Sequence, residues 1–484
     1  MDSVEITVVN GGTERKLKAA KGDTLLHALT KGGYILNAAC GGRGTCGKCK
    51  VSVLKGRTDA EPDEKGFVLS CKAKLVSDIT VELTDFAGQG VTESRSVELT
   101  GFRSGYGIAL DIGTTTLAFY LVNLSDGEIA DTYSCLNPQC IAGGDVISRI
   151  QACAKGRTEE LCDILRRKVN EVIRMFGDKV NCGIDEMMCA GNAVMLHIFY
   201  GKNPESIGVY PFTPVFLDSV CESGEKMGLD VGRVTLMPSF GSYVGGDLVA
   251  GVVATDLTSG NNVLADLGTN GEIVVCSDGK LSATATAAGP AFEGANITCG
   301  TGGVEGAINY FRSPDDYGTI GNKKAIGICG SGLIDIIAYM IREGIIDENG
   351  TFGEEDGVFR ITPDVYVTQK DVREFQLAKA AVSAGIRIAL RRASLRIGDV
   401  DKLYIAGGMG FYMNVESASE TGLIPPELKS RTEVCGNSAG LGARICLVES
   451  TRFAEAEKLA KKCDCYDLSC DAEFMDVFVE EMNF

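Results

Sequence analysis

The chain has 484 residues, which is too long for one compact core and predicts two to four structural units of about 150 residues each. Lys and Arg number 47 against 65 Asp and Glu, and a formal charge of −18 without a basic block argues against nucleic acid as a partner. Apolar stretches end before the roughly 18 residues of a membrane span. No signal-peptide order is present, so we expect a cytoplasmic protein without a membrane partner.

Residues 1–86 are expected to form one small unit. Alternating apolar residues over 4–19, interrupted by an Asn-Gly-Gly turn, predict two paired strands. A short helix is expected after Asp23 as its N-cap, followed by strands at 50–56 and 78–83. This order of elements is similar to that of a β-grasp ferredoxin.

The cysteines of this unit indicate a metal site. Nineteen cysteines in a chain without an export signal favour a reducing compartment, where thiols stay reduced or bind metal. Three lie within ten residues and a fourth follows after 21 more, which is typical of a [2Fe-2S] cluster held by Cys40, Cys46, Cys49 and Cys71. Neighbouring glycines let the backbone direct N–H groups at the sulfurs. Five residues separate the first two cysteines, one more than in the plant-type spacing.

Two other interpretations of these cysteines stay open. A structural zinc site usually brings two CxxC pairs or a CxxC with histidines. Here there is one such pair, and the two histidines, His27 and His197, are remote in sequence. Unligated loop thiols are the third interpretation.

Residues 87–105 are polar and rich in Gly and Ser, without sustained periodicity, and predict a linker. A flexible tether would let a redox unit move between electron donor and acceptor. A plain connector fits the same composition.

An internal repeat dominates the remainder. Residues 107–134 and 262–287 share a strand, the motif Asp-x-Gly-Thr, a second strand, Ser-Asp-Gly and a third strand. The two motif aspartates, Asp111 and Asp266, are 266 − 111 = 155 residues apart, which is the length of one domain. Glycine turns that approach phosphates closely, hydroxyls that bind their oxygens and carboxylates that hold Mg²⁺ predict an ATP site. The expected contacts are Gly113, Thr114, Thr115, Gly268, Thr269 and Asn270.

Two later strands also end in glycine-rich turns, at Gly330-Ser331 and at Gly407-Gly408. Together with the repeat, they resemble the actin, sugar kinase and heat-shock ATPase (ASKHA) superfamily, whose two βββαβα halves surround an ATP cleft. The expected fold class is α/β and α+β: a β-grasp ferredoxin domain, a linker, and a duplicated ASKHA domain with halves at 106–261 and 262–484.

What the protein uses ATP for decides between a kinase and an ATP-driven electron-transfer protein. A kinase of this superfamily needs a general base, for which Asp247 and Asp145 are candidates. A kinase, however, has no use for a [2Fe-2S] domain on the same chain. The fusion instead indicates that ATP hydrolysis drives an electron to an acceptor of low potential, since about 0.7 kcal/mol shifts a one-electron transfer by about 30 mV.

The motifs CGGRGTCGKC, DIGTTT, CAGNAVMLH, YPFTP, DLGTNGE, AGPAFEG, GICGSGLID and AGGMG, in this order, resemble the reductive activators of corrinoid proteins over nearly the whole chain. The resemblance implies an ATP-hydrolysing activase that returns Co(II) corrinoid to Co(I) for methyl transfer. It also implies the four cysteine ligands, nucleotide contacts around Asp111 and Asp266, and a corrinoid protein of a methyltransferase or demethylase system as partner. A low-potential ferredoxin or flavoprotein is the implied electron donor, and a homodimer is one option.

Because about 18 residues separate the ferredoxin unit from the strand of Asp111, we expect a short form without the extra middle domain of longer members.

Two alternative functions stay open: an activator of a 2-hydroxyacyl-CoA dehydratase-like enzyme, and a nucleotide-gated redox regulator. We expect His197 to be a satisfied helix residue. We expect Cys463, Cys465 and Cys470 to be packing residues without a second metal site.

Overall fold

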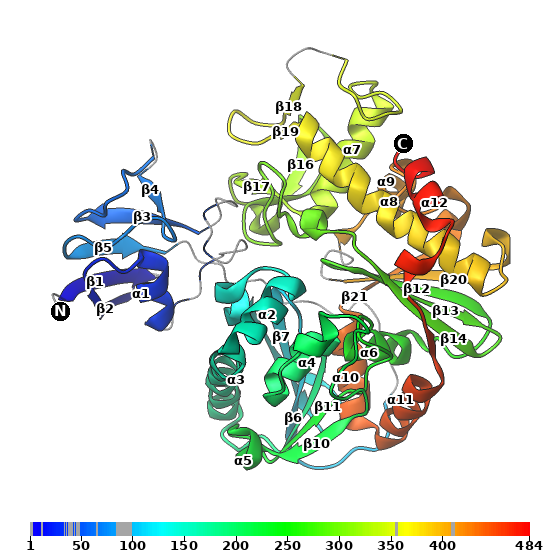
Figure 1. Ribbon diagram of the computed structural model, residues 1–484, viewed down its shortest axis with the longest axis horizontal. Coiled ribbons are helices and arrows are strands. Elements are labelled where there is room, and N and C mark those ends of the chain that lie inside the picture. Colours follow the sequence, from blue (N-terminus) through cyan, green and yellow to red (C-terminus); the bar gives the residue numbers. More distant parts are fainter. Residues whose placement is uncertain are drawn as a thin grey trace.

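The computed structural model shows a small N-terminal unit, drawn in blue, beside a larger two-lobed body (Figure 1). One lobe contains β6, β7, β10 and β11, and the other contains β12, β13, β14 and β20. The structure describes residues 3–10, 13–32, 34, 36, 42, 44, 49–63, 66–83, 99–353, 357–407 and 412–484.

The N-terminal unit is a five-stranded mixed sheet with one helix, in the order β2-β1-β5-β3-β4. Its elements are β1 Ser3–Asn10, β2 Thr13–Ala20, α1 Leu25–Lys31, β3 Lys50–Lys55, β4 Phe67–Leu69 and β5 Ile79–Glu82. Strand alternation buries one face, with Ile6 and Val8 fully inaccessible. The sequence predicts Asp23 as the cap of α1, but the structure shows Thr24, whose hydroxyl accepts a hydrogen bond from the N–H of His27 at 3.2 Å. Both residue types suit that position, so composition alone did not separate them.

The larger body contains two six-stranded sheets, in the orders β10-β11-β9-β6-β7-β8 and β21-β20-β12-β13-β14-β22, which share a plan over five strands and differ in the position of the sixth. In each, an antiparallel three-stranded meander is followed by two parallel strands beside its first strand. The first sheet consists of β6 Tyr106–Ile112, β7 Thr116–Asn123, β8 Ile129–Leu136, β9 Glu186–Gly191, β10 Val220–Ser223 and β11 Arg233–Leu236. The second consists of β12 Asn261–Leu267, β13 Gly271–Ser277, β14 Lys280–Thr286, β20 Lys402–Ala406, β21 Thr432–Gly436 and β22 Asp464–Cys465. The expected duplicated α/β fold is confirmed.

Helices cover both faces of each sheet. The main ones are α2 Val146–Ala152, α3 Thr158–Val180, α4 Ala193–Tyr200, α6 Gly246–Thr255, α7 Gly330–Arg342, α8 Gln369–Arg392 and α10 Ser438–Val448. Shorter or peripheral elements are α5 Gly224–Met227, α9 Val415–Glu420, α11 Ser450–Lys462, α12 Phe474–Glu480, β15 Ala307–Ser313, β16 Asp316–Thr319, β17 Gly327–Ile328, β18 Val358–Arg360 and β19 Tyr366–Thr368.

The pair α6 and α10 lies between the two sheets. In β6, Ala109 belongs to the buried cluster with α6 and α10, whereas Ile108 and Leu110 belong to the cluster with α3 and α4. In β12, Leu264 packs toward the same central helices, and its neighbours pack toward α7 and α8. Both faces of each sheet are therefore buried, which explains why these strands are apolar throughout.

A close helix contact fixes this central pair. A Cβ added at Gly442 of α10 would lie 1.9 Å from the carbonyl oxygen of Ala250 in α6. No residue other than glycine allows the two helix backbones to approach so closely.

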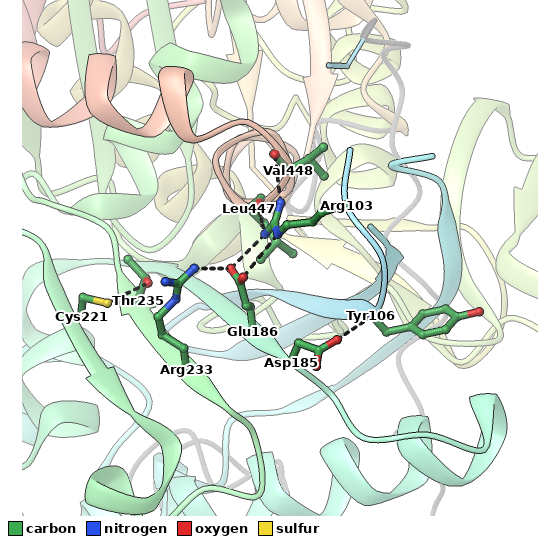
Figure 2. Close-up of polar contacts among 9 residues, drawn as sticks. All are labelled: Arg103, Tyr106, Asp185, Glu186, Cys221, Arg233, Thr235, Leu447 and Val448. Carbon is green, nitrogen blue, oxygen red and sulfur yellow. Dashed lines mark hydrogen bonds and ion pairs between the residues drawn. The ribbon is translucent and has the colours of Figure 1, made fainter. Parts of the chain in front are cut away.

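The last residues of the predicted linker, 99–105, are not a free tether, because Arg103 anchors them to both halves of the body (Figure 2). The rest of the predicted linker, residues 87–98, lies outside the described residues. Its guanidinium donates to Glu186 of β9 at 2.9 Å and to the carbonyl oxygens of Leu447 and Val448 at 2.8 and 3.1 Å. Leu447 and Val448 are the last two residues of α10, so their carbonyl oxygens have no hydrogen-bond donor within the helix. Arg233 of β11 binds the same Glu186 carboxylate at 2.8 Å.

Among the described residues, none of the helices combines the length and apolar character that a membrane crossing requires.

We predict that Glu186→Gln weakens the body of the protein in a pH-dependent manner. Burial acts to raise the pKa of Glu186, but the hydrogen bonds from Arg233 and Arg103 hold it below its ordinary value of 4.5. The contribution of the charged carboxylate is therefore present above about pH 4.5 and is lost as pH falls through the lower folded pKa. We expect the free energy of unfolding, measured by urea titration, to fall by about 1 kcal/mol at pH 7 and the difference to shrink below pH 4.

Glu160→Gln is the matched control, since Glu160 pairs with Arg157 on an exposed helix face. Its cost should stay below about 0.5 kcal/mol. Equal effects of the two substitutions would contradict an anchoring role for Glu186.

Candidate functional site

A cavity of about 340 Å³ lies between the β6–β7 turn of the first half and the β12–β13 turn of the second. Apart from the cysteines, nearly all the residues that the sequence predicts as site residues line it: Asp111, Gly113, Thr114, Thr115, Asp247, Asp266, Gly268, Thr269, Asn270, Gly330, Ser331 and Gly407. Gly408 lies outside the described residues, and Asp145 is not part of the lining.

Buried polar side chains hold the backbone of the first turn, between β6 and β7. Asn137 donates to the carbonyl oxygen of Gly113 at 2.8 Å, and the fully buried Arg149 donates to the carbonyl oxygen of Thr114. Asn192 donates to the Thr114 hydroxyl at 3.0 Å. These hydrogen bonds fix the backbone of the turn, and its residues line the cavity.

The second turn meets a glycine from a neighbouring strand. Gly407 follows β20 with φ +108°, and a Cβ there would lie 2.5 Å from the carbonyl oxygen of Leu267. Both the backbone conformation and the space require glycine at this position.

One carboxylate joins the two turns. Glu293, at the end of the 3₁₀ turn η4 Pro290–Glu293, accepts hydrogen bonds from the hydroxyls of Thr115 and Thr269, the latter at 2.8 Å. Thr115 belongs to the first half and Thr269 to the second, so this contact spans the cavity.

Acidic side chains dominate the electrostatics of the cavity. Loss of hydration, together with the charge of Asp247, raises the pKa of Asp111 to about 7. The same causes, with Asp111 as a further neighbour, raise the pKa of Asp266 to about 8. Burial raises the pKa of Asp247 to about 6 and that of Glu272 well above its ordinary value. A cation is therefore favoured in this cavity.

Among the described residues, no group of three or more His, Cys, Asp or Glu side chains converges closely enough to hold a metal ion by itself. This also applies to Cys463, Cys465 and Cys470 near the C-terminus.

Asp145 lies at the start of α2 and caps that helix. Its carboxylate accepts hydrogen bonds from the N–H and the hydroxyl of Ser148, both at 2.7 Å. An aspartate immediately before an apolar periodic segment is also a common helix-start signal.

Two asparagines of the cavity wall were not singled out from the sequence. Asn192 caps α4 and Asn437 caps α10, and each also directs its amide N–H into the site, Asn437 donating to Asp111 at 2.9 Å. Both follow a strand and a glycine, in AGNA and CGNS, so this shared strand-Gly-Asn-helix pattern is the signal that identifies them. Glu272 and Glu293 were missed as well.

The cysteine loop is described in part. Cys40 and Cys46 lie outside the described residues, whereas Cys49 and Cys71 are buried, with 1% and 9% of their surfaces exposed. The N–H of Ser70 donates to the carbonyl oxygen of Cys49 at 2.9 Å, which brings the two segments together. Gly42, with φ +79°, lies against the Cβ of Cys71. Buried thiols on adjoining segments, beside a glycine loop, fit a [2Fe-2S] cluster.

His197 is a satisfied core residue, as the sequence predicts. Its side chain is 1% exposed, and Nδ1 lies 2.6 Å from the carbonyl oxygen of Ala193. Its Nε2 accepts a hydrogen bond from the N–H of Val215 at 3.0 Å. Both ring nitrogens are occupied within the fold.

The fold and the cavity define a duplicated ASKHA domain that follows a ferredoxin-type domain. Three family models match in this order: the [2Fe-2S] iron-sulfur cluster binding domain at residues 8–76, the RACo middle region at 106–260, and the C-terminal ASKHA domain of RACo at 261–484.

The corrinoid activation enzyme RamQ of Eubacterium limosum is 32% identical over 416 residues, covering 78% of this chain and 70% of RamQ. The Co(II) methylated amine-specific corrinoid protein reductase of Methanosarcina barkeri is 23% identical, covering 74% of this chain and 72% of its own length. A solved structure of a reductive activator for corrinoid, iron-sulfur protein aligns with a TM-score of 0.72 and 27% identity over 99% of this chain and 98% of the other. The chain belongs to the RACo family of reductive activators of corrinoid proteins.

The prediction that the middle domain is absent is wrong. The model for the RACo middle region matches residues 106–260, which carry the first Asp-x-Gly-Thr turn. The middle domain was expected as an insertion before that turn, whereas the matched region coincides with the first half of the repeat.

We predict that Asp266→Asn stabilises the nucleotide-free protein as pH rises. Because folding raises the pKa of Asp266 from 3.8 to about 8, the folded protein keeps a proton that the unfolded chain releases between these two pH values, and the wild-type protein loses stability as pH rises through this range. The asparagine does not ionise. In metal-free buffer with EDTA, we expect its advantage in Tm to grow from pH 5.5 to pH 8.5, reaching about 2–4 °C.

Asp145→Ala is the control for this measurement, since it removes a carboxylate outside the cavity that caps α2. It should cost about 1 kcal/mol through loss of the cap. A Tm difference for Asp266→Asn that does not change with pH would contradict the raised pKa.

Proposed function

We propose that this protein is an ATP-dependent reductive activator that passes an electron from its [2Fe-2S] cluster to the Co(II) corrinoid of a partner protein in the cytoplasm. The product, Co(I), is the methyl acceptor of a methyltransferase or demethylase system. The relatives named as corrinoid activation enzyme and corrinoid protein reductase support this assignment. The observation that carries it is the presence, on one chain, of a [2Fe-2S] domain and a cavity framed by two phosphate-type turns.

ATP is the proposed occupant of the cavity. The 13-residue helix α7 begins at Gly330, its cap position Cys329 makes no side-chain capping bond, and its first residues face the cavity. Unsatisfied N–H groups at a helix start favour phosphate oxygens. The two glycine turns supply further N–H and hydroxyl donors.

Asp111, Asp247 and Asp266 are proposed to accompany Mg²⁺ bound with the nucleotide. Mg²⁺ usually keeps several waters and takes one or two carboxylates together with substrate phosphates. That mode of binding agrees with a site in which the carboxylates of the described residues do not close around a metal unaided. The cation would also offset the charges that raise the pKa values of these groups.

The cluster is proposed to be held by Cys40, Cys46, Cys49 and Cys71 and to supply one-electron transfer. An external low-potential ferredoxin or flavoprotein is the proposed source of electrons.

We propose that ATP biases the relative position of the two halves, since a ligand shifts an equilibrium only by its differential affinity for the two states.

We predict that Cys46→Ser abolishes the visible absorption of the cluster and the reduction of Co(II) corrinoid, because the cluster loses a ligand. ATP binding, measured by calorimetry, should stay within about twofold of the wild type, since the nucleotide turns lie in the other domain. The exposed Cys182 provides the control, Cys182→Ser, which should retain both properties. Co(II) reduction by Cys46→Ser at the wild-type rate would rule out the proposed electron path.

We predict that Asp111→Asn lowers ATP-dependent Co(II) reduction about 10²-fold or more while leaving the cluster spectrum unchanged. The control is Asp126→Asn, because Asp126 lies in the β7–β8 turn of the same half, outside the cavity. Wild-type reduction rates in Asp111→Asn, with ATP hydrolysis insensitive to the corrinoid partner, would refute the coupling.

The same assays separate the two alternatives. A dehydratase-type activator would show one [4Fe-4S] cluster shared by two subunits in iron, sulfide and EPR measurements. A redox regulator would bind a partner in an ATP-dependent way without reducing Co(II).

A further inference from the structure

Glu293 occupies a position where its carboxylate engages both glycine turns at once. Oε2 accepts a hydrogen bond from the Thr115 hydroxyl and Oε1 accepts one from the Thr269 hydroxyl at 2.8 Å. All three side chains line the same cavity. The carboxylate therefore bridges the first and second halves across the space proposed for ATP.

The backbone that presents Glu293 is rigid and belongs to the second half. The following residue, Gly294, has φ +75°, and a Cβ there would lie 2.3 Å from the carbonyl oxygen of Thr301. The preceding Phe292 is 2% exposed and packs edge-on against Phe375 of α8, with ring centroids 5.8 Å apart. The hydrogen bond to Thr115 is thus a contact between a fixed element of one half and a turn of the other.

The two hydroxyls donate to only one acceptor at a time. Each threonine hydroxyl carries a single proton, so a hydroxyl that donates to Glu293 cannot donate to a phosphate oxygen. The carboxylate is itself an anion in a cavity with several acidic neighbours, and it opposes an incoming phosphate.

We propose that Glu293 is a latch that ties the two halves together in the nucleotide-free protein and that is displaced when the phosphates of ATP take over the hydroxyls of Thr115 and Thr269. This inference rests on the proposed function in one respect, namely that ATP is the occupant of the cavity. Phosphate binding and release of the bridge to Thr115 are then the same event. The latched fraction of the protein lowers the apparent affinity for ATP, because only the unlatched fraction is competent to bind.

A second polar bridge at the cavity runs from Asn437 of the second half to Asp111 of the first at 2.9 Å, and it involves neither threonine. Removal of Glu293 therefore leaves this bridge, and the packing of α6 against α10, in place.

Calorimetric titration of the full-length protein with ATP and with adenosine tests the proposal. We expect Glu293→Ala to bind ATP about tenfold more tightly than the wild type, since hydrogen bonds to charged groups that ATP must break are absent. Adenosine has no phosphates, and its affinity should be unchanged. Two results would overturn the latch. Weaker ATP binding by Glu293→Ala would assign Glu293 to nucleotide binding, and unaltered ATP binding would assign it a purely structural role.

A double substitution separates competition for the hydroxyls from simple charge repulsion. In a Thr115→Val/Thr269→Val background, Glu293→Ala should improve ATP affinity by less than about threefold, because there are no hydroxyls to release. A full tenfold gain in that background would overturn the latch. Glu374→Ala is the matched control, since Glu374 is a carboxylate of α8 that accepts from Asn296 and does not line the cavity. It should leave ATP affinity unchanged.

The cluster absorption and the Tm of each variant report on folding. Glu293→Gln keeps the shape of the side chain without its charge, and it should bind ATP with intermediate affinity. Absence of ATP binding in both the wild type and Glu293→Ala would overturn the latch together with the nucleotide assignment. If ATP binds but does not support Co(II) reduction, the proposed function fails, whereas the difference in affinity still decides the latch.

Discussion

The contact between α6 and α10 is the constraint on which the geometry of the cavity depends. These helices lie between the two sheets, and Gly442 of α10 approaches the backbone of Ala250 too closely for any side chain. Each helix also starts beside the cavity, with Asp247 in the first turn of α6 and Asn437 as the cap of α10. A bulkier residue at this crossing would separate the helices and with them the two turns that face each other across the site.

The cavity concentrates acidic side chains where anionic phosphates are expected to bind, and the two would repel each other without a cation. Burial raises the pKa values of Asp111, Asp247 and Asp266 toward neutrality, and repulsion by neighbouring carboxylates raises those of Asp111 and Asp266 further. Such a cluster carries an electrostatic cost that a bound cation would offset. The carboxylate of Glu293 accepts hydrogen bonds from two threonine hydroxyls. In the proposed mode of binding, a nucleotide with its cation would replace these contacts.

The sequence predicted the parts of this architecture that are local and repeated. Two Asp-x-Gly-Thr turns in matching strand contexts were enough to predict the duplicated fold and the two turns that face each other across the cavity. Glu293 was not predicted, because its partners Thr115 and Thr269 are brought to it only by the folding of two domains. Asp145, a candidate base from the sequence, is instead the cap of α2, because an aspartate directly before an apolar helical segment is also a helix-start signal. The middle region was missed because it carries the first half of the repeat instead of standing before it.

The position of the linker constrains how the two functional parts can work together. Arg103 fixes the chain at Glu186 and at the end of α10, so the tether to the ferredoxin unit starts from the junction of both halves. Residues 84–98 number fifteen, and an extended chain of that length spans at most about 50 Å. On the other side, the thiol of Cys140 donates to the carbonyl oxygen of Leu36 at 3.4 Å, which places the ferredoxin unit against the first half. Cys140 follows Gln139, which accepts a hydrogen bond from Arg149 at 3.3 Å, and Arg149 supports the first turn at Thr114. Side-chain and backbone contacts through Gln139 and Arg149 therefore connect the first phosphate-type turn with the place where Leu36 of the ferredoxin unit meets the first half.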